Sequence, residues 1–121
     1  MKDSNFQTRV QDWVLACFPA SAHSDLDERV HRFLEEALEL SQSSGCSRDD
    51  AMALVDYVFS RPEGEVAQET GGVLVTLAAL SSAQGIIMDH AGEDELARNW
   101  SRIDQIRAKQ ASKPRGTALP Q

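Results

Sequence analysis

The chain has 121 residues, 41% hydrophobic and 26% charged, which is enough for one domain with a hydrophobic core. Its formal net charge of −7 disfavours non-specific nucleic-acid binding, which needs positive charge to displace counterions from phosphates. No apolar run is long enough to span a membrane, and Met1-Lys2-Asp3-Ser4-Asn5 lacks the apolar stretch of a secretory signal. Cys17 and Cys46 are expected to be free thiols of a reduced compartment. We therefore expect a cytoplasmic protein with no nucleic-acid or membrane partner.

Helical spacing of apolar residues dominates the chain, and strand alternation is nearly absent. The first predicted helix carries apolar residues over 6–17 and ends at Pro19. The second is capped by Ser24 and closed by Gly45. Its apolar side chains form a stripe at helical spacing that is expected to face the core: Leu26, Val30, Phe33, Ala37 and Leu40, with Leu34 alongside.

A third, shorter helix is predicted from its cap at Ser47 to the stop at Arg61-Pro62. A fourth is expected from about Glu63 to Gln84, with Gly85 at its end. From Thr70 to Gln84 it has no charged residue, so it should be buried, either in the centre of a bundle or against a partner subunit.

The last predicted helix runs from about Gly92 to Gln110, and residues 111–121 read as an irregular, flexible C-terminal tail. Together the pattern predicts an all-α fold, a bundle of about five helices that forms a single domain over 1–110.

Three carboxylates gather on the second predicted helix, in Glu35-Glu36-Ala37-Leu38-Glu39. At 100° per residue, Glu36 and Glu39 lie about 60° apart and Glu35 and Glu39 about 40° apart. Like charges so close repel one another unless something neutralises them. A plain solvated face is the alternative interpretation, because Glu28 and Arg32 occupy the same side, opposite the apolar stripe.

A second pair of acids, Glu65 and Glu69, stands one turn apart at the head of the most apolar helix. Carboxylates in this position would be partly buried, and burying an unpaired carboxylate is costly. A hard divalent cation would compensate, since carboxylate oxygens are preferred ligands of Mg²⁺. Inward-facing glutamates from two helices of a bundle can build such a site.

A basic stripe on the last predicted helix is the third feature. Arg98, Arg102 and Lys109 fall within about 40° of one another, where they could hold phosphate oxygens. The alternative is that they complement the helix dipole, which favours basic residues in the C-terminal half.

The order Glu35-Glu36-x-x-Glu39, a short helix, and then Glu69 at the head of an apolar helix resembles the all-α nucleoside triphosphate pyrophosphohydrolases, the MazG-like superfamily. The family pattern is Glu-Glu-x-x-Glu followed by Glu-x-x-Asp. The resemblance makes Glu36, Glu39 and Glu69 metal ligands and Glu35 the acid that orients or deprotonates water. Gly72 stands where the family has its final aspartate, and Glu65 is the carboxylate that could replace it.

This resemblance implies a MazG-like four-helix core completed by oligomerisation as a dimer or tetramer. It also implies hydrolysis of a (d)NTP to the (d)NMP and pyrophosphate, with Mg²⁺ as cofactor or Mn²⁺ as its substitute. Asn99, Arg102 and Lys109 are then counterparts of the residues that contact the substrate, with Arg107 nearby. Two alternatives remain: a catalytically inactive relative that binds nucleotide or metal, which Gly72 favours, and a helical interaction protein with solvated acidic faces.

Overall fold

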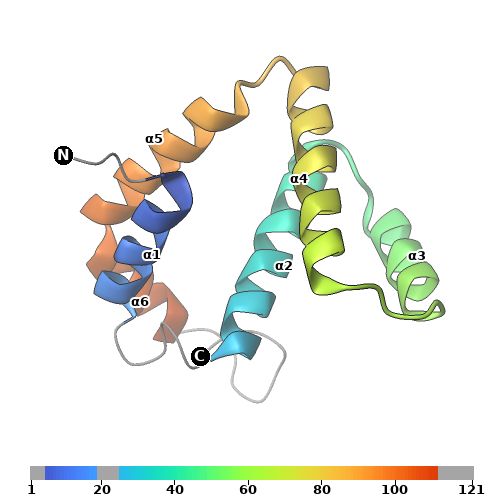
Figure 1. Cartoon of the computed structure of the whole chain (residues 1–121), viewed down its shortest axis with the longest axis horizontal. Coiled ribbons are helices and arrows are strands. Elements are labelled where there is room, and N and C mark those ends of the chain that lie inside the picture. Colours follow the sequence, from blue (N-terminus) through green and yellow to red (C-terminus); the bar gives the residue numbers. More distant parts are fainter. Residues whose placement is uncertain (1–4, 19–24, 112–121) are drawn as a thin grey trace. The chain divides into compact units, whose positions relative to one another are not determined.

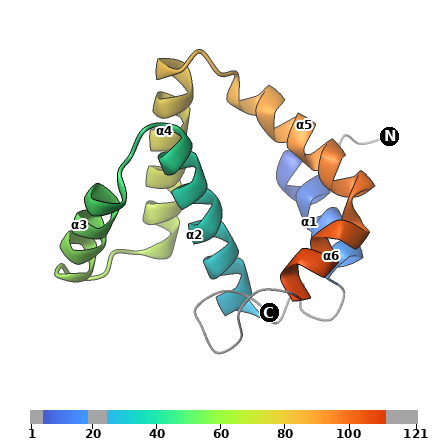
Figure 2. The same cartoon turned by 180° about the vertical axis from the view of Figure 1, so that it is seen from behind.

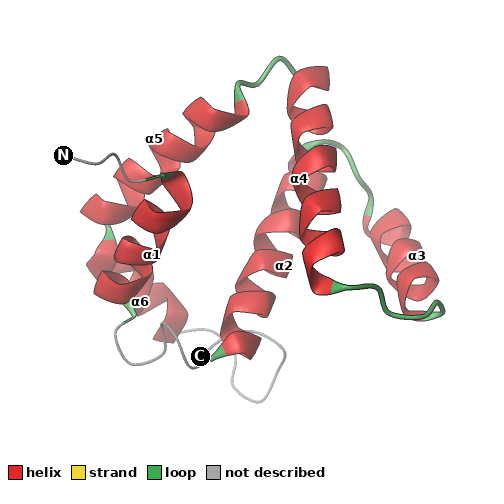
Figure 3. Cartoon of the chain, viewed as in Figure 1, coloured by secondary structure: helices red, strands yellow, loops and turns green. Residues whose placement is uncertain are grey.

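A computed structural model of the chain describes residues 5–18 and 25–111 (Figure 1). These residues form six α-helices and no strand, which confirms the all-α prediction (Figure 3). The helices are α1 (Phe6–Cys17), α2 (Leu26–Ser43), α3 (Arg48–Phe59), α4 (Val66–Ala83), α5 (Met88–Ser101) and α6 (Ile103–Ala111).

Side-chain caps begin the first three helices. Ser47 Oγ accepts a hydrogen bond from the Asp50 N–H at 3.1 Å, which confirms the predicted cap of α3. Asn5 caps α1 in the same way at 2.8 Å. At the start of α2, Asp25 Oδ1 accepts from the Glu28 N–H at 3.0 Å. The cap predicted at Ser24 and the stop predicted at Pro19 lie outside the described residues.

The same glycine turn ends α2 and α4. Gly45 and Gly85 have φ values of 98° and 68°, in the left-handed region that only glycine adopts at little cost. In both turns the residue after the glycine donates its N–H back into the helix, at 2.9 Å from Cys46 to Ser41 and from Ile86 to Ser81. The predicted ends of these helices are confirmed, and the next helix begins three residues after each glycine.

The final predicted helix is two helices in the structure, so the chain has six described helices where about five were expected. α5 begins at Met88, earlier than the predicted Gly92, and ends at Ser101. The Ser101 hydroxyl donates to the Arg98 carbonyl at 2.8 Å, and the Arg102 N–H bonds to the Asn99 carbonyl at 3.2 Å. These bonds tighten the backbone and end α5 at Ser101, so that one residue, Arg102, separates α5 from α6.

Two compact units make up the chain. Unit 1 comprises the described residues of Met1–Phe33 and Asp89–Gln121, and unit 2 is Leu34–Met88. α2 passes from one unit into the other at Phe33. The expectation of a single domain over 1–110 stays a prediction, as does the flexible tail, whose residues 112–121 lie outside those described.

Unit 1 has a hydrophobic core at the C-terminal end of α1. Val14, Cys17 and Phe18 are buried there, and Trp13 meets the Phe18 ring edge-on with 5.9 Å between centroids. The remaining apolar contacts of this core come from Val10, Ile103 and Ile106. An ion pair also joins α1 to α5, because Arg9 donates two hydrogen bonds of 2.6 Å to the carboxylate of Glu93.

Unit 2 contains the second half of α2, together with α3 and α4. Figures 1 and 2 show α2 and α4 running in the same direction. The helix between them in the sequence, α3, runs in the opposite direction. Gln84 Nε2 donates to Ser44 Oγ at 3.2 Å, so the C-terminal ends of α2 and α4 lie together. Ser81 is the one buried residue between 34 and 88, so this unit has no hydrophobic core of its own.

In the first half of α2, the apolar residues predicted to face the core are exposed and an acidic residue is buried. Leu26, Val30 and Phe33 are 74%, 50% and 53% exposed, whereas Glu28 is only 7% exposed. The alternative interpretation of the acidic cluster placed Glu28 on a solvated face, and the burial of Glu28 does not fit it. The reason is Phe18, since the guanidinium groups that pair with Glu28 also stack on this ring.

The charge-free helix α4 is largely exposed within a single chain, where the sequence predicts burial. Val73, Leu74 and Val75 are 39%, 55% and 70% exposed. In residues 5–18 and 25–111 no single helix is long and apolar enough to cross a membrane. Only α4 and α5 taken together meet the criteria of length and composition, and the chain bends by 102° between them.

Candidate functional site

The first acidic cluster lies in the second half of α2, and the helix is continuous through it. Glu36 and Glu39 are exposed, and Glu35 is half-buried. Because the helix is unbroken, the three carboxylates share one side of two adjacent turns, as the sequence predicts. The cluster belongs to unit 2.

The second acidic pair sits where the chain enters α4. Glu65 is the N-cap residue, with extended backbone and no capping hydrogen bond from its side chain, and Glu69 lies in the first turn. The Glu69 carboxylate folds back over Gly64, where an added Cβ would overlap it. Both glutamates are exposed, so the partial burial expected from the sequence is not seen in one chain. The positive end of the helix dipole favours an acid here without any cation.

The positions of these acids along their helices determine whether they can share an ion. Glu36 and Glu39 lie in the second half of α2, whereas Glu65 and Glu69 lie at the start of α4. Among the described residues, no group of three or more His, Cys, Asp or Glu side chains could hold a metal ion.

Gly72, which replaces the family aspartate, lies within α4 and has no neighbouring atom within 4 Å of the position a Cβ would take. Its backbone does not require glycine, since its φ is not positive. Packing in one chain therefore leaves room for an aspartate at this position.

The three residues that the resemblance assigns to the substrate all belong to unit 1. Asn99 is half-buried on α5, Arg102 is exposed at the break between α5 and α6, and Lys109 is exposed on α6. The break interrupts the basic stripe that one continuous helix would present. Arg98 on the same stripe pairs with Glu95 one turn away.

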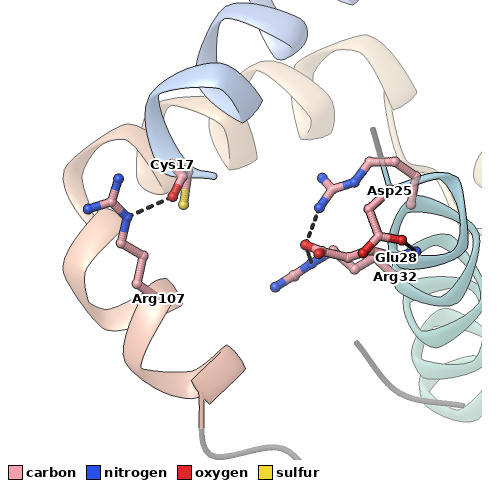
Figure 4. Close-up of polar contacts among 6 residues, drawn as sticks. Cys17, Asp25, Glu28, Arg32 and Arg107 are labelled. Carbon is pink, nitrogen blue, oxygen red and sulfur yellow. Dashed lines mark hydrogen bonds and ion pairs between the residues drawn. The ribbon is translucent and has the colours of Figure 1, made fainter. Parts of the chain in front are cut away.

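Arg107 has a structural role that the sequence did not indicate. Its Nε donates to the Cys17 carbonyl at 2.7 Å, and Nη2 donates to the Ala16 carbonyl at 2.9 Å (Figure 4). The guanidinium therefore satisfies carbonyls at the C-terminus of α1, which a helix leaves without partners. The two contacts join residues 90 or more positions apart, and no short-range pattern encodes them.

A second polar cluster surrounds Phe18. The Arg29 and Arg32 guanidinium carbons lie 5.1 and 4.6 Å from the centre of its ring, and both side chains pair with the buried Glu28 (Figure 4). Burial raises the pKa of the adjacent Cys17 thiol, although these arginines oppose the shift.

An open groove of about 280 Å³ lies between α1 and α5 in unit 1. Its walls combine the Arg9–Glu93 ion pair with an apolar floor; the lining residues are Arg9, Asp12, Glu93, Leu96, Ala97 and Trp100. None of the residues predicted from the sequence as site residues lines it.

Comparison of the chain with the models of known protein families finds no match. Searches of curated proteins and of solved structures also find no match.

Proposed function

We propose that the protein is a cytoplasmic, Mg²⁺-dependent nucleoside triphosphate pyrophosphohydrolase that converts a (d)NTP to the (d)NMP and pyrophosphate. One observation carries the proposal: the two acidic motifs occur in the order, spacing and helical setting of the MazG-like enzymes. Glu35, Glu36 and Glu39 occupy one side of α2, α3 intervenes, and Glu69 lies in the first turn of α4. Mn²⁺ is the expected substitute for Mg²⁺.

The proposed enzyme works as a homodimer or homotetramer. Support comes from the large apolar side chains of unit 2 that are exposed in one chain, among them Leu74, Val75 and Phe59 at 55%, 70% and 84%. Burial of such side chains against a second copy would be favourable.

The chain's own residues have distinct proposed roles. Glu36, Glu39 and Glu69 hold the ion, with Glu65 taking the place of the missing aspartate. Glu35, the half-buried member of the cluster, orients the attacking water or accepts its proton. Asn99, Arg102 and Lys109 bind the nucleotide, and the forked guanidinium of Arg102 is suited to phosphate oxygens.

A panel of nucleoside triphosphates with Mg²⁺ tests the proposal, with pyrophosphate rather than orthophosphate measured as product. We expect turnover that a chelator abolishes. Glu36→Gln and Glu39→Gln should each lose more than the roughly 10- to 100-fold typical of outer-shell metal partners. Glu95→Gln is the matched control, because this exposed glutamate of α5 pairs only locally with Arg98. Full activity in both α2 variants would remove these residues from the site.

The alternative, an inactive relative that binds nucleotide without turnover, is favoured by Gly72. Under this alternative, Mg²⁺ and nucleotide would raise the melting temperature with no pyrophosphate released. Gly72→Asp would distinguish the two readings further, since the space around position 72 is open. If the variant gains activity that the parent lacks, the missing aspartate accounts for the inactivity. A protein that responds to neither ligand would instead be a helical interaction protein.

A further inference from the structure

The open groove of about 280 Å³ between α1 and α5 combines an apolar floor with an exposed aromatic ring. Leu96 is buried beneath it, and Ala97 beside Leu96 carries only a methyl group, which leaves the groove unfilled. Trp100, one turn further along α5, lines the same groove and is 45% exposed, so part of its indole ring is open to a ligand. The volume lies just below the range of pockets for drug-sized ligands and suits one planar ring system.

Asp12 gives this groove an available carboxylate. It is exposed and makes no hydrogen bond or ion pair with the residues that the structure describes. Glu93, the other acid of the groove, is instead held by the two 2.6 Å hydrogen bonds from Arg9. A carboxylate acts only as an acceptor when it is ionised, so Asp12 is suited to a ligand that donates N–H groups.

The charges of the groove restrict the ligand further. One guanidinium and two carboxylates leave the groove with a net negative charge, which disfavours an anionic group such as a phosphate. A planar ring with N–H donors could stack on Trp100 and present its donors to Asp12. Arg9 stands one turn before Asp12 on α1 and lines the same groove, so a positive charge adjoins the carboxylate.

Guanine is the nucleobase whose hydrogen-bonding edge matches this order of charges. Its N1–H and its 2-amino group form a fork of two donors that one carboxylate accepts together, and its O6 acceptor adjoins N1–H. The donors would face Asp12 and O6 would face the positive charge of Arg9. Adenine, cytosine and uracil each place an acceptor beside the donor of this edge, and that acceptor would be repelled by the carboxylate.

We infer that this groove of unit 1 binds a guanine base, which stacks on Trp100 and donates hydrogen bonds to Asp12. Binding of the base requires no hydrolysis. Only the consequence for specificity, that a guanine nucleotide is the preferred substrate, rests on the proposed function. The inference gives a role in base recognition to two residues that the resemblance leaves without one.

Saturation-transfer difference NMR on the full chain, without metal, tests the inference with the monophosphates of guanosine, inosine, adenosine and cytidine. We expect guanosine monophosphate to bind roughly tenfold or more tightly than the adenosine and cytidine compounds, with saturation of its H8 proton. Inosine monophosphate lacks the 2-amino group and should bind with intermediate affinity. Asp12→Asn should weaken guanosine monophosphate roughly tenfold.

Three further variants separate the parts of the groove. Trp100→Ala should weaken the guanosine and inosine compounds alike, by roughly tenfold, because stacking does not depend on the 2-amino group. Ala97→Leu should block binding by filling the floor while leaving every charge in place. Asp94→Asn is the matched control for Asp12→Asn, because it removes the charge of an exposed acid of α5 that does not line the groove. Circular dichroism verifies that each variant is folded.

The outcomes separate this inference from the proposed function. Equal affinities for the guanosine and adenosine compounds, or full affinity for guanosine monophosphate in Asp12→Asn, would overturn the inference. Displacement of guanosine monophosphate by an equal concentration of N-acetylarginine amide would assign the groove to guanidinium groups and also overturn it. A protein that binds guanosine monophosphate as expected but hydrolyses no nucleoside triphosphate would overturn the proposed function alone.

Discussion

Units 1 and 2 contain similar helices but differ in what holds the helices together. Unit 1 buries Val14, Cys17 and Phe18, and contacts distant in sequence join α1 to both α5 and α6. Unit 2 has regular helices with good caps and turns, yet its one buried residue is a serine. Local signals are thus sufficient to define helices in both units, whereas among the described residues buried apolar side chains occur only in unit 1. Because most helical stability in proteins comes from packing, the two units offer a comparison of helices with and without a buried apolar core.

The largest expected effect comes from making the same substitution in each unit. Phe18 is 8% exposed and Phe59 is 84% exposed. Phe18→Ala should lower the free energy of unfolding by about 3–5 kcal/mol, since it empties a packed position and removes the ring on which two guanidinium groups stack. Phe59→Ala should have an effect only where the chain is oligomeric. Urea unfolding at several protein concentrations measures both.

The dependence of the two stability losses on protein concentration distinguishes these substitutions. We expect the Phe18→Ala loss to be the same at every protein concentration and any Phe59→Ala loss to fade on dilution. If Phe59→Ala costs as much as Phe18→Ala at all concentrations, another part of the same chain covers Phe59. The contrast between the units would then be lost.

The next largest effect concerns the hydrogen bonds that join α6 to α1. Arg107→Ala removes two hydrogen bonds from a charged donor to the Cys17 and Ala16 carbonyls, and we expect a loss of about 1–2 kcal/mol after allowance for its exposed position. Arg98→Ala, which breaks a local pair with Glu95, should change stability by less than about 0.5 kcal/mol. Equal effects of the two variants in thermal unfolding would show that Arg107 does not hold α1.

Features that depend on interactions between residues close in sequence could be predicted, and features that depend on contacts between distant residues could not. The Ser47 cap and the glycine turns at Gly45 and Gly85 are local, and each was predicted correctly. The exposure of the apolar stripe on α2 was not predicted. The burial of Glu28 depends on Phe18, the C-cap residue of the preceding helix, whose ring Arg29 and Arg32 cover.

The candidate site could also be predicted only in part from the sequence. Helical periodicity places Glu36 and Glu39 together, and the structure keeps them on one continuous helix. It does not fix the direction of α4 relative to α2, and Figures 1 and 2 show the two helices running the same way. That direction depends on the path of the chain through α3, and periodicity contains no information about it. The break at Ser101 and the capping role of Arg107 were missed for the same kind of reason.

A smaller effect is expected from a glycine substitution in α4, and it would show whether a partner helix covers this part of unit 2. Gly71 and Gly72 stand within α4 with no atom near their missing Cβ positions. Gly72→Ala should stabilise an uncovered helix by about 0.5–1 kcal/mol through helix propensity alone. If a partner helix approaches closely at this position, the methyl group would instead weaken the oligomer. Circular dichroism at low protein concentration and light scattering at high concentration distinguish these results, and Ala79→Gly is the reverse control on the same helix.

The smallest expected effect is the pH response of the Arg9–Glu93 ion pair in unit 1. Arg9 donates two hydrogen bonds to Glu93 and lowers the pKa of this carboxyl below its ordinary value of 4.5. Since the folded-state pKa is the lower one, the pair stabilises the protein above about pH 4.5, and the contribution is lost as pH falls through the lowered pKa. The melting temperatures of wild type and Glu93→Gln should therefore differ at pH 7 and converge near pH 3. Asp94→Asn removes one charge from the same helix and should leave this convergence unchanged. A constant difference between wild type and Glu93→Gln down to pH 3 would mean that packing of α1 on α5, rather than the ion pair, makes the connection, and that the order of unit 1 does not depend on this charge.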